Sequence, residues 1–469
     1  MASRVLLIST NRCATPDLVF PLGLSHLTAS LRRAGHTTRW VDLSADGTSL
    51  TTILAEFCPD LVGVSVRNID DVLIRKRETY YNQLADLIGT VRQTHPCPVV
   101  LGGSGFSLFP ERLLELTGAD YGIQGEGEFA LRELIAALES GKSPEGIAGL
   151  VFHRAGSVVA NPPLAAALEE ALEPADRPAD LVQHYLARAG MLNVQTQRGC
   201  AHRCCYCTYP VIEGRSHRPR PPEAVAEEMA QMEAQGARYA FIVDSIFNST
   251  PRHVTQVCEA LIRREVKLRW GCFLRPQGLT SELMSLMVRA GLAHIEFGSD
   301  SFCDPVLQAY DKRLTFADIR QASELARRHQ VDSCHFLVCG GPGETEETLQ
   351  TTFEHSRQLA GAVIMAMVGM RIYPGTTLHQ RALREGRVTP DTDLLTPVYY
   401  LAEGLEESQV FALLQEFAKQ SPNWVVGDAS PAYTRLVERL RSRGVVGPLW
   451  SYFSMVQRLW SPQLAAPAS

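Results

Sequence analysis

The sequence predicts an α/β protein that consists of a doubly wound parallel sheet, a partial (β/α)6 barrel and a helical C-terminal region. Short apolar strands alternate with amphipathic helices in each half of the chain, which indicates two separate sheets. A proline-rich stretch at 162–178 breaks any long helix between the two runs. We therefore expect a sheet domain at 1–150, a connector at 151–190, the barrel at 191–380 and the helical region at 381–469.

The first half predicts a Rossmann-like sheet. Strands are expected at 4–8, 38–43, 61–66, 99–101 and 121–123, and helices at 23–34, 80–92 and 111–117. Such sheets bind ligands beyond the carboxyl ends of their strands. The candidates at those ends are Ser65, Arg67, Asn68, Gly102, Gly103, Ser104, Gly125 and Gly127. Glycines let a backbone approach a bulky ligand and equally suit tight turns, so both interpretations stay open.

The second half predicts a TIM-type partial barrel with six strands. They are expected at 192–197, 239–243, 269–274, 294–298, 333–338 and 363–372, and helices at 222–235, 252–264, 281–290, 316–329 and 345–359. In such barrels the chemistry lies at the strand carboxyl ends. The tail from 399 onward is expected to be mostly helical, with Trp424, Trp450 and Trp460 exposed.

Composition narrows the class of protein. The 469 residues carry a net charge of −6, which gives no electrostatic footprint for nucleic acid. No uncharged apolar run reaches about 18 residues, so no membrane span is expected. The first ten residues lack the layout of a signal peptide. These features favour a cytoplasmic protein whose 12 cysteines stay reduced.

Four of the cysteines crowd into eight residues, whereas the other eight are scattered and are expected to be buried apolar residues. Cys200, Cys204 and Cys207 have the spacing C-x3-C-x2-C, just past the first barrel strand. Three thiolates on one loop would hold a [4Fe–4S] cluster and leave one iron open. The alternatives are coincidence or a zinc site completed by His202 or Cys205.

This triad, with Tyr206 before its last cysteine, resembles the signature of radical S-adenosylmethionine (SAM) enzymes. The resemblance implies that an electron from the cluster cleaves SAM to methionine and a 5′-deoxyadenosyl radical, with an external flavodoxin- or ferredoxin-type reductant. It assigns the iron ligands to the three cysteines and places Tyr206 against the SAM adenine. The other SAM contacts that it implies are Asp244 or Ser245 for the amino group, Arg275 for the carboxylate, Ser299 and Asp300 for the ribose, and Gly340 and Gly341 for the adenine.

A Rossmann-like domain ahead of such a barrel resembles the subclass that binds cobalamin (B12). The loops with Ser65, Asn68, Gly102, Gly103 and Ser104 match those that wrap cobalamin or its nucleotide tail. The D-x-H-x-x-G motif that supplies a lower axial histidine is absent, and no histidine occurs from 11 to 23. Either Arg67 or Asn68 lies under the corrin instead, or the domain has lost cobalamin and persists as a scaffold.

Two activities on a small biosynthetic substrate follow from this resemblance. In the first, one SAM methylates cobalamin, a second SAM yields the radical, and the methyl group passes to an unactivated carbon. In the second, cobalamin is absent or idle, and a substrate radical loses water or rearranges, as in aminoglycoside 1,2-diol dehydratases of natural-product biosynthesis. Elimination needs a general acid or base, for which Tyr209, Glu213 and Tyr373 are candidates. Alternatively, Glu213 only pairs with Arg215 to hold its loop.

Overall fold

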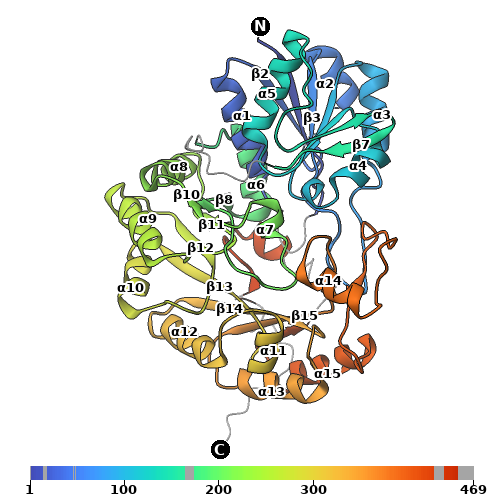
Figure 1. Cartoon of the computed structure of the whole chain (residues 1–469). Helices are drawn as coiled ribbons and strands as arrows, with labels where there is room; N and C mark the ends of the chain where they lie inside the picture. The colour runs from blue at the N-terminus through green and yellow to red at the C-terminus, as the bar shows by residue number, and fades with distance from the viewer. Residues whose placement is uncertain are drawn as a thin grey trace, which may run out of the picture.

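The computed structural model describes residues 2–13, 18–45, 47, 49–163, 174–426, 438–450 and 452. The chain forms two seven-stranded sheets, one in each half, as the sequence predicts (Figure 1). The N-terminal sheet lies at the top of Figure 1 and the barrel sheet below it. No helix in the described part of the chain is both long and apolar enough to cross a membrane.

The N-terminal sheet has the order β2-β1-β3-β4-β5-β6-β7, and its first five strands are parallel. Alternate residues of a strand point to opposite faces, so Val5 and Leu7 pack with α1 and α5 while Leu6 and Ile8 pack with α2, α3 and α4. Helices therefore cover both faces, which confirms the doubly wound prediction. The strands are β1 (Arg4–Ser9), β2 (Thr37–Asp42), β3 (Leu61–Ser65), β4 (Val99–Gly102), β5 (Tyr121–Ile123), β6 (Leu150–Arg154) and β7 (Ser157–Ala160), and the helices are α1 (Leu22–Arg33), α2 (Leu50–Phe57), α3 (Leu84–Thr94), the short 3-10 helix η1 (Phe106–Leu108), α4 (Pro110–Thr117) and α5 (Gly127–Ser140).

The N-terminal sheet extends past the predicted boundary at residue 150. The hairpin β6–β7 adds two antiparallel strands beside β5, so residues 151–160 belong to the sheet and not to a connector. Its two-residue turn, Ala155-Gly156, has positive φ at both positions, which matches the right-handed twist of paired strands. The connector shrinks accordingly and contains α6 (Ala179–Ala189).

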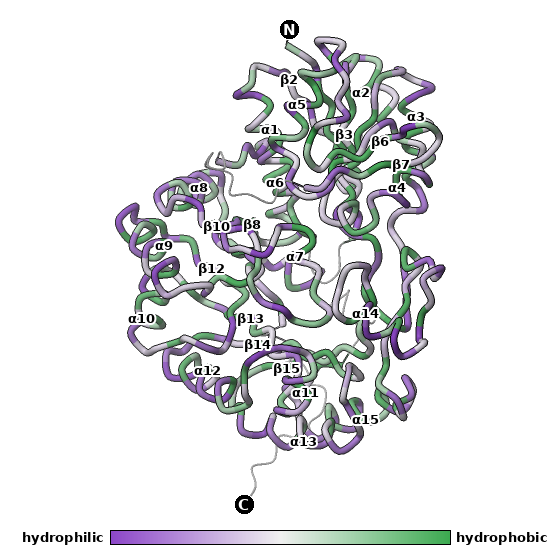
Figure 2. The backbone as a smooth tube through the Cα atoms, viewed as in Figure 1, coloured by the Kyte–Doolittle hydropathy of each residue, from purple (hydrophilic) through white to green (hydrophobic). Residues whose placement is uncertain are grey.

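The barrel sheet has the order β8-β11-β12-β13-β14-β15-β18, and all its strands are parallel. The six predicted strands are present, and a seventh, β18, comes from the tail. Figure 2 shows the strands of both sheets mostly as hydrophobic segments, with hydrophilic stretches on the outer helices. The strands are β8 (Leu192–Val194), β11 (Tyr239–Ile242), β12 (Arg269–Leu274), β13 (Leu292–Asp300), β14 (Asp332–Cys339), β15 (Val363–Val368) and β18 (Trp424–Val426).

Helices and two small strand pairs surround this sheet. Along the chain, strands of this sheet alternate with helices, as expected for repeated βα units. The helices are α7 (Tyr209–Ile212), α8 (Pro222–Ala234), α9 (Pro251–Arg263), α10 (Ser281–Arg289), α11 (Asp304–Ala309), α12 (Phe316–Arg328), α13 (Glu346–Ser356), α14 (Thr377–Arg384) and α15 (Glu407–Gln420), and the antiparallel pairs are β9 (Gln197–Arg198) with β10 (Arg218–Pro219) and β16 (Met370–Arg371) with β17 (Tyr399–Tyr400).

Two of the three tail tryptophans, Trp424 and Trp450, are buried, contrary to the expectation that they are exposed. Trp424 lies in β18 and is 0% exposed, because that strand extends the barrel sheet. Trp450 is 6% exposed, and its indole donates to Glu296 Oε1 at 2.9 Å. Trp460 lies outside the described residues. The tail is helical in α15 and also completes the barrel.

The carboxyl ends of the two sheets face each other. Arg371, just after β15, donates to the carboxylate of Asp70, which follows β3, at 2.9 Å. Arg198, just after β8, donates to Glu128, which follows β5, at 2.6 Å. Parallel sheets bind ligands at these ends in both fold types. The fold therefore brings the two predicted binding edges together.

Candidate active site at the facing sheet edges

The three predicted iron ligands lie on one short loop after β9. The backbone N–H of Cys200 donates to the Gly214 carbonyl at 3.1 Å, which fixes the start of the loop. The N–H of Cys207 donates to the Cys204 carbonyl at 3.1 Å and closes its last turn. Cys200 is buried, and the other two thiols keep some accessible surface. The loop therefore presents three cysteines at the carboxyl edge of the barrel.

Gly199 allows this loop to fold. It has φ +84°, and a Cβ built there would lie 1.9 Å from the Ser216 carbonyl oxygen, so a side chain does not fit. Its N–H donates to Glu213 Oε2 at 3.0 Å, and Gln195 donates to Glu213 Oε1 at 2.8 Å. Glu213 thus fastens the cysteine loop to the barrel, and its hydrogen bonds go to these two residues instead of Arg215.

The thiols lie in a desolvated environment. Burial raises the pKa of Cys207 to about 12 and also raises the pKa of Cys204. Among the described residues, no three His, Cys, Asp or Glu side chains are placed to bind one metal ion. A [4Fe–4S] cluster spreads its thiolates over different irons, and three cysteines on one loop fit that arrangement.

Tyr206 and Asp300 lie together, as the resemblance implies for two neighbouring parts of one SAM site. The Tyr206 hydroxyl donates to Asp300 Oδ2 at 2.7 Å. Lys312 forms an ion pair with the same oxygen at 2.7 Å. The sequence interpretation missed Lys312, although the basic pair Lys312-Arg313 between two predicted elements was a usable signal. The Asp300 carboxylate therefore joins the cysteine loop to a buried cation.

Of the two candidates for the SAM amino group, Ser245 is the better placed. Asp244 is 0% exposed, and its carboxylate accepts from the backbone and the hydroxyl of Thr196, so it points into the protein. Burial raises the pKa of Asp244 to about 7. Ser245 keeps accessible surface, and its hydroxyl donates to the Gly199 carbonyl at 2.9 Å, directly before the cysteine loop.

Arg275 lies beside the cysteine loop, where a SAM carboxylate is expected. Its guanidinium donates to the carbonyls of Lys312 and Arg313 and to Gln277, and it lies 3.5 Å from His202 of the loop. Burial lowers the pKa of Arg275. The side chain is thus held in one place by backbone oxygens.

Ser299, Gly340 and Gly341 serve the packing of the barrel. Ser299 is 0% exposed and shares a hydrogen bond of 2.7 Å with His335, so it is not available to a ribose. A Cβ on Gly341 would lie 2.3 Å from the Tyr310 hydroxyl oxygen, and one on Gly340 would meet Leu401 at 2.6 Å. These glycines are required by close packing, although their backbone still lines the barrel edge.

The glycines after β4 have a similar structural reason. Cβ atoms on Gly103 and Gly105 would lie 2.7 and 3.0 Å from the carbonyl oxygens of Val66 and Arg67, while one on Gly102 meets only ordinary contacts. Ser104 donates to the Arg67 carbonyl at 2.9 Å. The β4 loop therefore lies directly on the β3 loop and supports it, which favours the turn interpretation for Gly103.

Arg67 is the unusual residue of the β3 loop. It is partly accessible, yet burial lowers its pKa, and Tyr209 of the barrel is among the groups close enough to influence it. Its hydrogen bond goes to the Asn68 side chain at 3.3 Å, and no ion pair with a carboxylate is found among the described residues. A desolvated charge is normally paired, so an arginine without a carboxylate partner is unusual at this position. Ser65, at the start of the loop, keeps accessible surface and accepts from Thr10 through its carbonyl.

The β5 loop contacts the barrel through its glutamates. Glu128 and Glu126 both pair with Arg198, at 2.6 and 3.1 Å, and Glu126 also pairs with Arg218. Gly125 has φ +83°, and a Cβ there would meet Pro163 at 3.4 Å; one on Gly127 would meet Leu27 at 3.1 Å. The sequence interpretation weighed only the glycines here and missed this arginine–glutamate network. One of its members, Arg198, lies two residues before Cys200 in the chain.

Two of the candidate acid–base residues, Tyr209 and Tyr373, are partly accessible and do not hold the cysteine loop. Tyr209 begins α7 and is partly accessible, and burial raises its pKa. Tyr373 is also partly accessible, and its hydroxyl donates weakly to Asp70 at 3.5 Å. Tyr209 lies near Arg67 of the loop after β3, here called the Arg67 loop, whereas the Glu213 carboxylate holds the cysteine loop.

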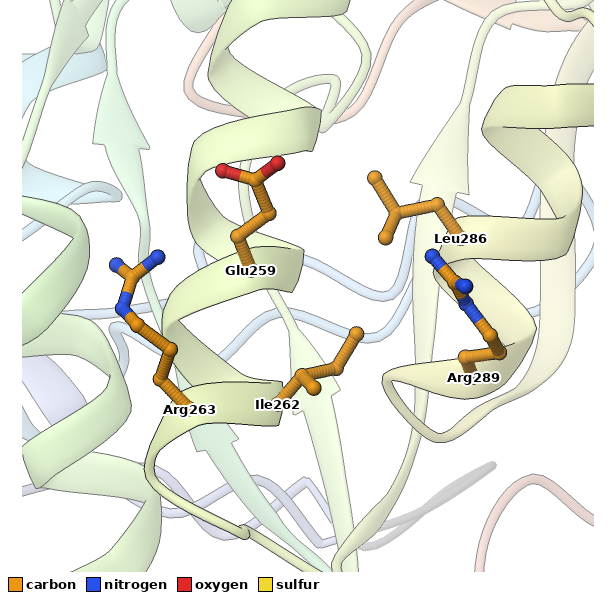
Figure 3. Close-up of a pocket in the computed structure, with 5 residues that line it drawn as sticks. All are labelled: Glu259, Ile262, Arg263, Leu286 and Arg289. Carbon is orange, nitrogen blue, oxygen red and sulfur yellow. The ribbon is translucent and has the colours of Figure 1, made fainter.

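A surface depression lies elsewhere and does not belong to this site. It has a volume of about 330 Å³ and lies between α9 and α10 on the outside of the barrel (Figure 3). None of the predicted site residues lines it. Its lining residues are Glu259, Ile262, Arg263, Leu286 and Arg289.

Comparisons with known proteins agree with both halves of this arrangement. Residues 194–355 match the model of the radical SAM superfamily, and residues 13–135 match that of the B12 binding domain. The chain is 27% identical over 443 residues to tryptophan 2-C-methyltransferase of Streptomyces laurentii. The aligned region covers 79% of this chain and 73% of that protein.

Two solved structures share the whole fold. The radical SAM methyltransferase TsrM from Kitasatospora setae, solved with cobalamin and a [4Fe–4S] cluster bound, has a TM-score of 0.86 and 24% identity, and covers 99% of this chain and 100% of that one. The cobalamin-dependent radical enzyme OxsB, solved with aqua-cobalamin and SAM, has a TM-score of 0.74 and 17% identity, and covers 99% of this chain and 75% of that one. This chain therefore carries a radical SAM domain in its barrel half and a B12-binding domain ahead of it.

Proposed function

We propose that this radical SAM enzyme methylates an unactivated carbon of a small biosynthetic intermediate, with a [4Fe–4S] cluster, SAM and cobalamin as its cofactors. The observation that carries the proposal is the meeting of the cysteine loop and the Arg67 loop at the facing sheet edges. When bound, the cluster supplies an electron for the cleavage of SAM, and cobalamin supplies a carrier for the methyl group.

Cys200, Cys204 and Cys207 would hold the cluster, on a loop fixed by Gly199 and Glu213. Around it, Tyr206, Ser245 and Arg275 would hold SAM, together with the backbone of the loop at 340–341. Arg275 is suited to a carboxylate because backbone oxygens hold its guanidinium in place, while its Nη1 donors make only the long contact of 3.5 Å with His202.

The loops after β3, β4 and β5 would hold cobalamin. Arg67 would lie beneath the corrin, in the place that a histidine takes in many cobalamin proteins. An arginine has no acceptor atom and stays protonated, so it would supply hydrogen-bond donors and a positive charge to the cofactor but no ligand to its metal. Asn68 orients its guanidinium, and Ser104 supports the Arg67 backbone.

The substrate would lie between the two edges, beside Tyr209 and Tyr373. Both phenols keep accessible surface there, so either can hold or accept a proton near the reacting carbon. Tryptophan is the substrate bound in one TsrM structure. For this chain we propose the broader class of small natural-product intermediates, without nucleic acid or membrane partners and in the cytoplasm.

An external one-electron donor of the flavodoxin or ferredoxin type would reduce the cluster. Arg203 and Arg215 are exposed on and beside the cysteine loop, and no ion pair holds either of them among the described residues. The one acid between Gly199 and Arg220, Glu213, is turned inward. A basic surface of this kind suits an acidic electron carrier.

The test uses two neighbouring cysteines. After anaerobic reconstitution, Cys204→Ala should bind less iron and form no 5′-deoxyadenosine from SAM, whereas Cys205→Ala should retain both properties. Cys205 is a buried packing residue and is thus the matched control. Formation of 5′-deoxyadenosine by Cys204→Ala would refute the proposed cluster site.

Cobalamin is tested separately. Protein produced with cobalamin available should carry a corrinoid absorption spectrum, and Arg67→Met should change that spectrum or weaken retention of the corrinoid. A colourless wild-type N-terminal domain would reject methylation and leave the 1,2-diol dehydration or rearrangement alternative, whose products would then be sought. Relatives named as methyltransferases are the reason to place methylation first.

A further inference from the structure

Two short strands form the neck of the cysteine loop. β9 and β10 pair antiparallel, with Arg198 directly opposite Arg218, and the chain between these two arginines carries all three predicted iron ligands. Each strand contributes only two residues to the pair, and one of them, Pro219, has no N–H to donate. The backbone pairing that closes the neck is therefore weak, and the side chains at the neck decide how firmly it is held.

The two arginines at the neck carry the same charge at close range. Residues directly opposite each other in an antiparallel pair point to the same face, with Cβ atoms about 5 Å apart, and like charges there repel. The side chains of Arg198 and Arg218 are only 9% and 18% exposed, so water screens this repulsion less than it would on the surface. The two strands can pair stably only if an anion lies between the guanidinium groups.

That anion comes from the N-terminal domain. The Oε2 atom of Glu126 accepts from Arg218 Nη1 at 3.1 Å and lies 3.1 Å from Arg198 Nη1, while its Oε1 atom accepts from Arg218 Nη2. Glu128, from the same loop after β5, accepts two hydrogen bonds from Arg198, at 2.6 and 3.2 Å. Forked contacts between a carboxylate and a guanidinium fix orientation as well as charge. Glu126 is thus the residue that bridges both ends of the neck.

We infer that Glu126 is a positioning residue of the cluster site: it neutralises the two opposed arginines and so keeps the neck of the cysteine loop closed. This inference rests on the cluster proposed above. Arg218 also donates to the Glu213 carbonyl at 2.7 Å, so its guanidinium connects Glu126 directly to the cysteine loop. Without the charge of Glu126, only Glu128 would remain to offset two facing cations, and the neck would open more often. The N-terminal domain then contributes to the retention of iron in the barrel.

The experiment measures how fast iron leaves the reconstituted full-length protein under anaerobic conditions, with an excess of a ferrous-iron chelator and without SAM or substrate. Glu126→Gln keeps the size of the side chain but removes its charge, so iron should leave about tenfold faster than from the wild type, through more frequent opening of the neck. Asp393→Asn is the control. Asp393 also joins the two halves of the chain, but its partner at 3.2 Å is Arg112 instead of an arginine of the neck, so this variant should release iron at the wild-type rate.

A double variant separates repulsion between the arginines from a general loosening of the site. Glu126→Gln/Arg218→Gln removes the opposed charges together, so it should fold and release iron more slowly than Glu126→Gln, at about the rate of Arg218→Gln alone. The inference is overturned if Glu126→Gln releases iron at the wild-type rate. It is also overturned if the double variant loses iron at least as fast as Glu126→Gln, or does not fold either where Glu126→Gln does not fold. A wild type that binds no cluster refutes the proposed function instead.

Discussion

The guanidinium of Arg371 donates to the Asp70 carboxylate at 2.9 Å and so joins the barrel to the N-terminal sheet. The same guanidinium donates to the carbonyls of Ile372 and Leu394, both at 2.7 Å. The side chains of the pair are 3% and 0% exposed. This pair, here called the Asp70 clamp, fixes the loop that carries Arg67 against the barrel.

Arg371→Met should lower the free energy of unfolding by about 3–5 kcal/mol, because it leaves the Asp70 carboxylate buried and unpaired. Arg112→Met is the matched control: Arg112 pairs with Asp393 between the same two halves at 3.2 Å, but both side chains are about half exposed. Loss of that pair should cost no more than about 1 kcal/mol. Urea unfolding measures both values, and equal losses would contradict the assignment of the clamp.

Gly199→Ala should abolish cluster incorporation. The new Cβ would lie 1.9 Å from the Ser216 carbonyl oxygen and would push the cysteine loop away. Gly214→Ala is the control, since its φ of +86° is similar but nothing lies within 4 Å of the new Cβ. That variant should lose only about 1–2 kcal/mol of stability. Iron content per chain distinguishes the two, and a full cluster in Gly199→Ala would show that the loop tolerates displacement.

Glu344 should make the protein less stable as the pH rises. It accepts from the Gly340 N–H and the Tyr310 hydroxyl, and burial raises its pKa to about 7. The folded chain therefore holds a proton that the unfolded chain releases near its ordinary pKa, so this contribution is full below about pH 4 and is lost as the pH rises through about 7. Between about pH 5 and pH 8 the urea midpoint of cluster-free wild-type protein should therefore fall relative to that of Glu344→Gln, and this difference isolates Glu344 from the other titrating groups. A pH dependence of Glu344→Gln equal to that of the wild type would argue against a raised pKa of Glu344.

Arg203→Glu/Arg215→Glu should slow turnover with a flavodoxin as the electron donor by more than about tenfold, because repulsion replaces attraction at the docking surface. Turnover with a small chemical reductant should remain. Arg289→Glu on α10 is the control for added negative charge. Equal losses with both reductants, or a raised KM for the substrate, would assign the arginines to the active site instead of a docking surface.

The arrangement of elements was largely predictable because apolar runs mark buried strands. The strands around 61–66, 99–101, 121–123 and 269–274 lie where expected, within a residue. The hairpin at 150–160 was missed because antiparallel edge strands are short and half-exposed, and β18 was missed because three residues carry no periodic signal.

The site was predictable only where spacing along the chain determines it. The cysteine triad is local, so its place after the first barrel strand could be predicted. Lys312, Arg198 and the Asp70 clamp depend on contacts between residues far apart in the chain. Asp244 and Ser299 have suitable side chains and lie at the expected strand ends, but both side chains are buried in the protein. Neighbouring residues of a strand point to opposite sides, and the sequence alone does not show which of them faces the site.

The late position of β18 also affects how the protein is made. Cys207 leaves the ribosome long before Trp424, yet both belong to one barrel, and Trp450 follows later still. The sheet that supports the cysteine loop therefore lacks its last strand for much of synthesis, and iron delivered during that time meets an open structure. Assembly of the cluster is expected to be a post-translational event that waits for the C-terminal end of the chain.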